Sequence, residues 1–152
     1  MKSLIVYKSI HHGNTEKIAM VLAEVLQAKL LSTREATPQI IGRYDLIGFG
    51  SGIYFGKHHH KLLSLVDDLP QIKDKQAFIF STSGIRKLPI IHNFNKELRK
   101  KLLSKNYKVI GNFSCRGIDS YGPLKLIGGI QKKHPDQDDF DRAALFAENL
   151  IK

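Results

Sequence analysis

The sequence LIVYKSIHHGNT, residues Leu4–Thr15, decides the fold and points to a binding site. Its first four residues are apolar, and such a continuous run predicts a buried strand. The segment Ser9–Thr15 then combines a glycine with hydroxyl side chains and leads into a sequence of helical period. A buried strand that ends in this kind of loop before a helix offers backbone N–H groups and a positive helix end to one anion. The stretch therefore predicts a phosphate cradle, as in proteins that bind nucleotides or flavins.

The composition is that of one globular domain. The chain has 152 residues, of which 42% are hydrophobic, enough for a sizeable core but too few residues for two ordinary domains. No apolar run approaches the roughly 18 residues that span a bilayer, and the apolar stretch at the N-terminus is too short for a signal peptide. Cys115 is the single cysteine, so no disulfide can form within the chain. We expect residues 1–152 to form a single cytoplasmic domain.

The chain is strongly basic. It carries 24 Lys and Arg against 14 Asp and Glu, a formal charge of +10. Such a charge attracts nucleic acid, anionic lipid or an acidic partner, and it also arises from a solvated lysine-rich surface. Six of the basic residues are arginine, the residue preferred for phosphate forks and base edges, and the sequence has no zinc-finger, RNP or recognition-helix pattern. We therefore expect no nucleic-acid binding as the main role.

Apolar runs alternate with segments of helical period along the chain. In the first helical segment, at about residues 14–29, Ile18, Leu22 and Leu26 recur on one face. Thr37 and Pro38 predict the start of a short helix. Further helical faces are those of Leu62, Leu65, Val66 and Leu69; of Ile91, Phe94, Leu98 and Leu102; and of Phe140, Ala143, Ala144, Ala147 and Ile151. Strands are predicted at Leu4–Tyr7, Leu30–Leu31, Tyr44–Gly50, Ala77–Phe80 and Val109–Phe113.

This alternation predicts an α/β fold, a doubly wound parallel sheet of five strands with helices on both faces. In such a sheet, ligands bind beyond the carboxyl ends of the strands, at the point where the strand order reverses. Four predicted strands are followed by small or polar residues, at Ser9–Thr15, Ser51–Gly56, Ser81–Gly84 and Cys115–Gly117. We expect these segments to meet along one edge of the sheet. The second of them contains two aromatic side chains, which can stack on a planar ring.

The chain resembles the flavodoxin-like FMN proteins over nearly its full length. In that family the first loop binds the FMN phosphate with hydroxyls around a Gly-x-Thr, and Gly13–Thr15 matches this pattern. Ser9 is a further match, whereas His11 and His12 stand where threonines are common. Imidazole N–H groups can still donate to a phosphate. The resemblance implies the strand order 2-1-3-4-5.

The resemblance also implies which residues hold FMN. The first loop would bind the phosphate, and the segment Gly52–Gly56 would flank the isoalloxazine ring, with Tyr54 or Phe55 stacked on it. Ser83 and Gly84 would offer backbone contacts to the far edge of the ring. The implied cofactor site comprises Ser9, His11, His12, Gly13, Asn14, Thr15, Ser51, Gly52, Ile53, Tyr54, Phe55, Gly56, Ser83 and Gly84.

Two departures from the family bear on function. Electron-carrier flavodoxins are typically acidic, and they tend to stack an aromatic side chain of the third loop on the flavin. This chain is basic, and its third loop, Ser81–Arg86, has no aromatic residue. A basic surround favours the reduced, anionic flavin, so we expect a less negative reduction potential than in an acidic flavodoxin.

Three functions remain open from the sequence. The first is an FMN protein that transfers electrons between redox partners, with no catalytic residue of its own. The second is an FMN-dependent oxidoreductase that uses NAD(P)H or a small substrate such as a quinone or porphyrinogen, with Arg86 and Arg116 as candidate contacts for an anionic substrate. The third is a non-redox module that binds an anion or a nucleotide. The partner is then a redox protein or a small substrate, and we expect a monomer or weak dimer.

Other polar residues have less specific interpretations. The histidines of His11–His12 and His58–His60 could ligate a metal, but no Cys or acidic ligand is spaced with them, so phosphate or solvent contact is favoured. Cys115 precedes Arg116, whose charge could activate a thiol, but a small packed residue is favoured. Asp67 has no obvious partner, and we expect the lysines of residues 96–101 to form a solvated helix face.

Overall fold

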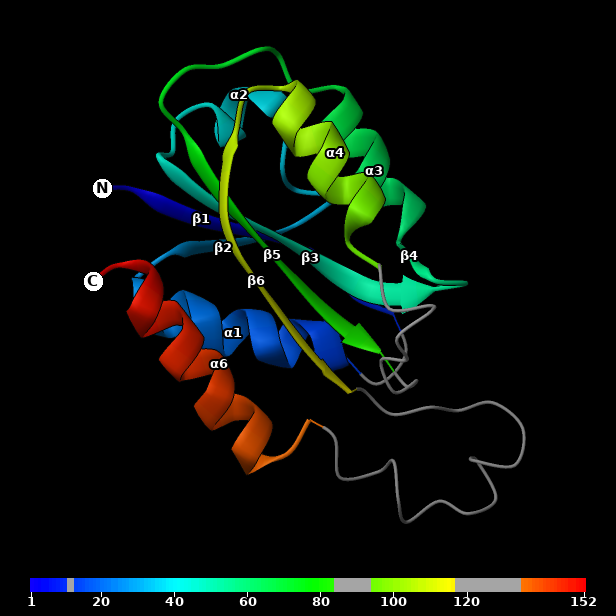
Figure 1. The fold of residues 1–152 in the computed structure, drawn as a ribbon, viewed down its shortest axis with the longest axis vertical. Helices are drawn as coiled ribbons and strands as arrows, with labels where there is room; N and C mark the ends of the chain where they lie inside the picture. The colour runs from blue at the N-terminus through cyan, green and yellow to red at the C-terminus, as the bar shows by residue number, and fades with distance from the viewer. Residues whose placement is uncertain (11–12, 84–93, 117–134) are drawn as a thin grey trace.

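Five parallel strands lie in the order β2-β1-β3-β5-β6 at the centre of the molecule (Figure 1). The computed structural model describes residues 1–10, 13–83, 94–116 and 135–152. Counted in chain order without the two-residue β4, which pairs antiparallel with β3, these strands follow the predicted order 2-1-3-4-5. The strands are β1 (Ser3–Lys8), β2 (Lys29–Ser32), β3 (Leu46–Tyr54), β4 (Lys57–His58), β5 (Gln76–Ser83) and β6 (Lys108–Arg116).

Helices cover both faces of the sheet, as the sequence predicts (Figure 1). Alternate strand residues face opposite sides, so Leu4 and Ile5 belong to different cores. One core lies under α1 (Asn14–Leu26) and α6 (Gln137–Leu150), and the other lies under α2 (Pro38–Ile41), α3 (His60–Asp67) and α4 (Lys96–Ser104). The aromatic core comprises Phe49, Phe78, Phe80 and Phe113, all buried as expected.

Local capping signals begin and end several helices. The Thr37 hydroxyl accepts from the N–H of Ile40 at 3.2 Å, with Pro38 at the first helical position. Asp136 and Asp139 form a reciprocal capping box at the start of α6. The α1 helix is three residues shorter than expected because Gln27 adopts a left-handed conformation, φ 52°, after Leu26.

The strands extend further than their apolar runs. The segments Ser51–Tyr54 and Ser81–Ser83, predicted as loops, continue β3 and β5, and Cys115 and Arg116 belong to β6. Each has neighbours to pair with, as in the registers Ser51↔Ser81 and Thr82↔Cys115. Because ladder hydrogen bonds are available on these strands, they override the turn preference of small polar residues.

Glycines in β3 make room for the aromatic core. A Cβ at Gly48 would lie 2.3 Å from Cζ of Phe78, and a Cβ at Gly50 would lie 2.3 Å from Cε2 of Phe80. These two positions can therefore hold no larger residue without moving a buried ring. Their role is to seat β5 side chains under α1 and α6.

The α3/α4 pair also corrects one expectation. Asp67, which we expected to lack a partner, pairs with Lys101 at 2.7 Å. The Lys101 side chain thus forms an ion pair with a residue of α3, while Arg99 and Lys100 are exposed as expected. The helix predicted from Ile91 onward begins at Lys96 in the structure, and Ile91 itself lies outside the described residues.

Candidate functional site

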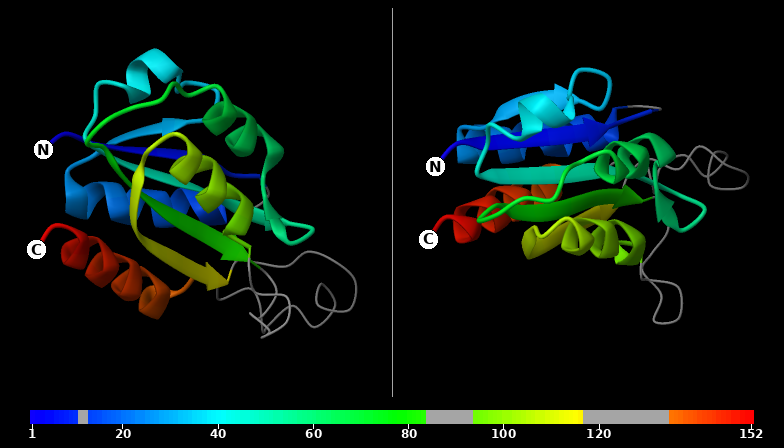
Figure 2. Two further views of the ribbon diagram at one scale, coloured as in Figure 1. Left: turned by 45° about the horizontal axis from the view of Figure 1, so that its top comes forward. Right: turned by 90° about the horizontal axis from the view of Figure 1, so that it is seen from above.

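The candidate site lies at the carboxyl edge of the sheet. From β1 the chain moves to β2 on one side and to β3 on the other, so the strand order reverses beside β1. Both chain ends lie at the opposite edge (Figure 2). Helix α1 starts directly after β1, so its positive end faces the reversal point, where ligands bind in open α/β sheets.

The N-terminus of α1 has no side-chain cap. The N-cap residue is Gly13, whose backbone is left-handed at φ 65°, and no atom among the described residues lies within 4 Å of where its Cβ would be. The first N–H groups of the helix therefore keep their donor capacity. An anion that reaches Gly13 would meet these donors and the positive end of the helix dipole.

Two side-chain oxygen atoms beside this turn are buried and have no hydrogen-bond partner among the described residues. Within the described parts of the chain, Ser9 Oγ and Asn14 Oδ1 have no hydrogen-bond partner. Asn14 is 7% exposed. A buried polar atom without a partner is costly, so a ligand that hydrogen-bonds to these two atoms would be stabilised by them. Together with the uncapped helix end, these residues fit a phosphate group.

The Thr15 hydroxyl connects α1 to the sheet. Its Oγ1 lies 2.7 Å from Oγ1 of Thr82 in β5, and both residues are buried. A hydroxyl has one proton and two acceptor positions. If Thr82 donates, the proton of Thr15 is left for a ligand. Thr82 belongs to the segment Ser81–Gly84 that was expected at this edge, but it is not among the predicted cofactor-binding residues.

A carboxylate also lies near the helix start. Tyr7 donates its phenolic proton to Glu16 Oε2 at 2.6 Å. Burial and this hydrogen bond to the carboxylate raise the pKa of Tyr7 to about 12, so the phenol remains a donor at neutral pH. Glu16, which accepts this hydrogen bond, lies in the first turn of α1. Its negative charge there interacts favourably with the positive end of the helix dipole.

The side chain of Ser51 is occupied within the fold. Ser51 Oγ lies 2.8 Å from Nδ1 of His58 and accepts the N–H of His59 at 3.0 Å. His58 Nε2 lies 2.7 Å from Asn95 Oδ1, before α4. Asn95 Oδ1 can only accept, so the neutral tautomer of His58 carries its proton on Nε2 and donates to Asn95. The one proton of Ser51 Oγ then lies between Nδ1 of His58 and the carbonyl oxygen of Gly52, which is 2.7 Å away. Among the described residues, Ser51 therefore offers a ligand its backbone rather than its hydroxyl.

His58 is buried and links β4 to Asn95, the residue before α4. It is 3% exposed, so it contacts neither phosphate nor solvent, contrary to the expectation for the His58–His60 segment. Burial lowers the pKa of His58 to about 4, and the hydrogen bond that His58 donates to Asn95 opposes this shift. Asn95 occupies the N-cap position of α4 but makes no capping bond, because its oxygen faces His58. The sequence gives no local signal for this pair.

The β3–β4 hairpin carries the two candidate aromatic residues. Tyr54 is half-buried, with its hydroxyl 2.7 Å from where a Gly52 Cβ would be and its ring edge-on to His59 at 5.3 Å. Phe55 is fully exposed at the hairpin tip, next to Gly56. The hairpin thus places Tyr54 against the sheet edge and Phe55 outward.

The remaining predicted site residues lie either at the same sheet edge or outside the described residues. Ile53 is half-buried and pairs with His58, and Ser83 ends β5 at the same edge. His11, His12 and Gly84 lie outside the described residues, as do Arg86 and the segment that follows Arg116.

Cys115 is a packed core residue at the end of β6. Its side chain is 7% exposed, and burial, together with the charge of Asp139, raises the pKa of its thiol to about 12, against a smaller opposing effect of Arg142. A thiol with this pKa carries little thiolate at neutral pH. The structure therefore favours the packing role over the reactive one.

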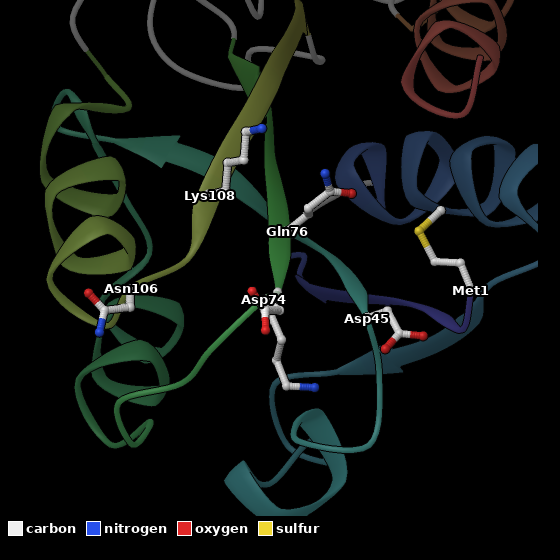
Figure 3. Close-up of a pocket in the computed structure, with 7 residues that line it drawn as sticks. Met1, Asp45, Asp74, Gln76, Asn106 and Lys108 are labelled. Atoms are coloured by element: carbon white, nitrogen blue, oxygen red, sulfur yellow. The ribbon is translucent and has the colours of Figure 1, made fainter.

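A separate cavity opens at the amino edge of the strands. It has a volume of about 650 Å³ and is lined by Asp45, Asp74, Asn106 and Lys108 among others (Figure 3). Lys75, also in its lining, donates to the carbonyl oxygens of Gly42 and Tyr44. This cavity is remote from the helix start at Gly13, because parallel strands place their two ends on opposite edges.

The described residues contain neither a metal-binding cluster nor a membrane-spanning helix. In these parts of the chain, no three His, Cys, Asp or Glu side chains gather in an arrangement that would hold a metal ion. No helix there has the length and hydropathy to cross a bilayer.

Known proteins with similar sequences bear on the family of this chain. A family model described as "Flavodoxin domain" matches residues 4–118. An uncharacterised protein of Methanocaldococcus jannaschii is 50% identical over 152 residues, covering 100% of this chain and 99% of that one. The flavodoxin-like domain-containing protein BilS of Clostridioides difficile is 24% identical over 174 residues, covering 99% and 97%.

Solved structures agree at the level of the fold. Oxidised flavodoxin 1 of Bacillus cereus superposes with a TM-score of 0.72 at 15% identity, covering 99% of this chain and 97% of that one. At such identity the likeness concerns architecture alone. With the family match over residues 4–118 and the strand order above, it leads to one conclusion: the chain belongs to the flavodoxin family.

Proposed function

We propose that this protein binds FMN non-covalently and carries electrons between redox partners. The observation that carries the proposal is the uncapped start of α1, with the buried, unpartnered Ser9 Oγ and Asn14 Oδ1 beside it among the described residues. These donors and orphaned groups stand at the strand reversal of a chain of the flavodoxin family.

Different residues would hold different parts of the cofactor. The backbone N–H groups after Gly13 and the hydroxyls of Ser9 and Thr15 would bind the phosphate, and Asn14 would accept from the ribityl chain. His11 and His12 would add imidazole donors. The segment Gly52–Gly56 would flank the ring, with Tyr54 as the stacking aromatic.

FMN, when bound, supplies the redox chemistry, and the protein supplies position and charge. In this arrangement Ser51 acts through the backbone, since His58 holds its side chain. Ser83 and Gly84 would contribute backbone contacts at the far edge of the ring. No protein side chain is required as an acid or base for electron transfer.

The test is titration of FMN into the purified protein, followed by quenching of flavin fluorescence. We expect one FMN per chain with a Kd in the micromolar range or below. Ser9→Ala should weaken binding by about 10-fold, the effect of one lost hydrogen bond to a charged group. The same change should leave the free protein as stable or more stable, because it removes a buried hydroxyl that has no partner in the described structure.

Ser104→Ala is the matched control. Its hydroxyl donates to the carbonyl oxygen of Lys101 near the end of α4, remote from the carboxyl edge. This variant should bind FMN like the wild type. No FMN binding at micromolar concentrations, or equal affinities for Ser9→Ala and wild type, would refute the proposed site.

An FMN-dependent oxidoreductase is the second candidate, and one observation favours it. The segment Ser81–Arg86, which begins in the last residues of β5, has no aromatic residue to cover the flavin, which suits access by a hydride donor or small substrate. The FMN-loaded protein should be mixed anaerobically with NADH or NADPH in the absence of any reductase. Rapid loss of flavin absorbance would support the enzyme, whereas a stable spectrum would support the carrier.

A further inference from the structure

Phe55 is exposed in a way that folding does not explain. Its side chain has a relative exposure of 106%, the highest among the large hydrophobic residues that are exposed in the described structure. It stands at the tip of the β3–β4 hairpin. This hairpin lies at the carboxyl edge of the sheet (Figure 1). Burial in this protein's own core therefore cannot account for an aromatic residue here.

The backbone at this position also disfavours phenylalanine. Tyr54 pairs with Lys57, which leaves Phe55 and Gly56 as a two-residue turn, with φ values of 53° and 78°. Positive φ at both central residues is the pattern of a type I′ turn, whose first position prefers Asn, Asp or Gly. A bulky residue in the left-handed region is strained, and strain of this kind concentrates at functional positions.

Positive charge surrounds the hairpin. Lys57 follows the turn, and Lys61 lies in the first turn of α3. Lys8 ends the neighbouring strand β1, in register with Ser51. The charges of Lys8 and Lys61 act on His59, whose pKa is lowered mainly by burial and then by His60 and these two lysines.

We call Phe55, Lys57, Lys61, Lys8, His59 and His60 the basic hairpin surface. Glu97 is the acidic residue that the described structure pairs with it, at 3.6 Å from Lys57 Nζ, and the Lys57 side chain remains 67% exposed. The surface thus keeps a positive charge beside an exposed aromatic residue, and aromatic residues are enriched in protein interfaces.

We propose that the basic hairpin surface docks an acidic redox protein, with Phe55 inserted into an apolar pocket of that partner. The redox character of the partner rests on the proposed function, since the surface lies at the same sheet edge as the proposed FMN site. The acidic character rests on charge complementarity, which steers association and fixes orientation.

A protein fits this surface better than a nucleic acid or a membrane. Binding of single-stranded nucleic acid uses several stacking aromatics, and base recognition uses arginine, whereas this surface has one exposed aromatic and lysines. Membrane-bound segments insert a broad apolar face, whereas Phe55 is a single fully exposed apolar residue, followed by Gly56 and Lys57.

The test uses two acidic probes, a [2Fe–2S] ferredoxin and a rubredoxin, at low ionic strength. The ¹⁵N-labelled protein without FMN is titrated with each, and its amide shifts are followed by NMR. We expect at least one probe to bind with a Kd below about 100 μM, with shifts centred on residues 53–61, and affinity falling steeply as salt rises.

Two variants with matched controls separate the anchor from the charge. Phe55→Asn should weaken binding at least 5-fold while raising the melting temperature, because asparagine tolerates the left-handed turn. The exposed Leu145 on α6 provides its control, and Leu145→Gln should leave binding unchanged. The double change Lys57→Gln with Lys61→Gln should weaken binding at least 5-fold, whereas Lys73→Gln with Lys108→Gln, of equal charge at the amino edge, should not.

Several outcomes would overturn the proposal. These are no binding of either probe, binding equally weakened by both charge pairs, or Phe55-dependent binding only to vesicles of phosphatidylglycerol or to a single-stranded oligonucleotide. FMN titration of the same samples distinguishes the two proposals. A protein that binds the acidic probes through Phe55 but binds no FMN retains the docking surface and loses the proposed function.

Discussion

The buried histidine of β4 makes stability depend on pH in a predictable direction. His58 has a pKa of about 4 in the folded protein, against 6.5 in an unfolded chain. Between these values the unfolded chain binds more protons than the native one, so the free energy of unfolding falls as pH falls. The contribution of neutral His58 is fully present above pH 6.5 and is lost as pH falls toward 4.

The size of this effect follows from the two pKa values. Lowering the pH from 7 to 4.5 should remove about 2.5 kcal/mol of stability through His58 alone. His58→Gln abolishes the titration. At pH 7 the variant should be less stable by about 1–3 kcal/mol, because Ser51 Oγ loses its ring partner in a buried place. At pH 4.5 most of this difference should disappear.

The assay is urea denaturation followed by far-UV circular dichroism at both pH values, for wild type, His58→Gln and His60→Gln. His60 is exposed at the first position of α3, so its variant serves as the control for removing a histidine. The control should keep the wild-type pH dependence. The assignment of a buried neutral histidine is wrong if wild type and His58→Gln lose the same free energy of unfolding between pH 7 and 4.5. It is also wrong if NMR titration gives the His58 imidazole a pKa near 6.5.

Three further predictions concern packing and reactivity. Gly48→Ala should cost about 1–3 kcal/mol in urea unfolding, because its Cβ would lie 2.3 Å from the Phe78 ring; an unchanged midpoint would contradict the packing. Thr82→Val should cost about 1–3 kcal/mol, because Thr15 loses its partner at 2.7 Å; calorimetry of the variant measures this, and no loss would show that Thr15 finds another partner. Cys115 should react with Ellman's reagent at pH 8 only at the rate of unfolding, because its thiol is 7% exposed with a pKa of about 12; fast labelling of the native protein would refute this.

Much of the fold is predictable because its signals are local. Apolar runs, helical faces and the Thr37–Pro38 start each report on neighbouring residues, and their order along the chain predicts a parallel sheet with helices on both faces. The strand ends were harder. Ser51–Tyr54 and Ser81–Ser83 have the composition of loops, and pairing with other strands makes them β.

The candidate site divides in the same way. The turn at Gly13 is predictable because glycine, Asn14 and Thr15 carry their own conformational and hydrogen-bonding preferences. The orientation of the Ser51 side chain is not predictable, because it depends on a contact with His58. The orientation of His58 depends in turn on Asn95, which is 37 residues away in the chain. The distinction between Tyr54 against the sheet and Phe55 in solvent follows from the hairpin turn, which the sequence analysis did not predict.

By itself, the sequence determined the order of strands and helices, the glycine turn before α1 and the membership of a family, because these depend on residues that are near one another in the chain. The tertiary structure decided which polar groups are occupied and which are available. Thr15 meets Thr82 across 67 residues, and Ser9 Oγ and Asn14 Oδ1 are left without hydrogen-bond partners in the described structure. Hydrogen-bond satisfaction is a property of the folded neighbourhood, and no local pattern specifies it.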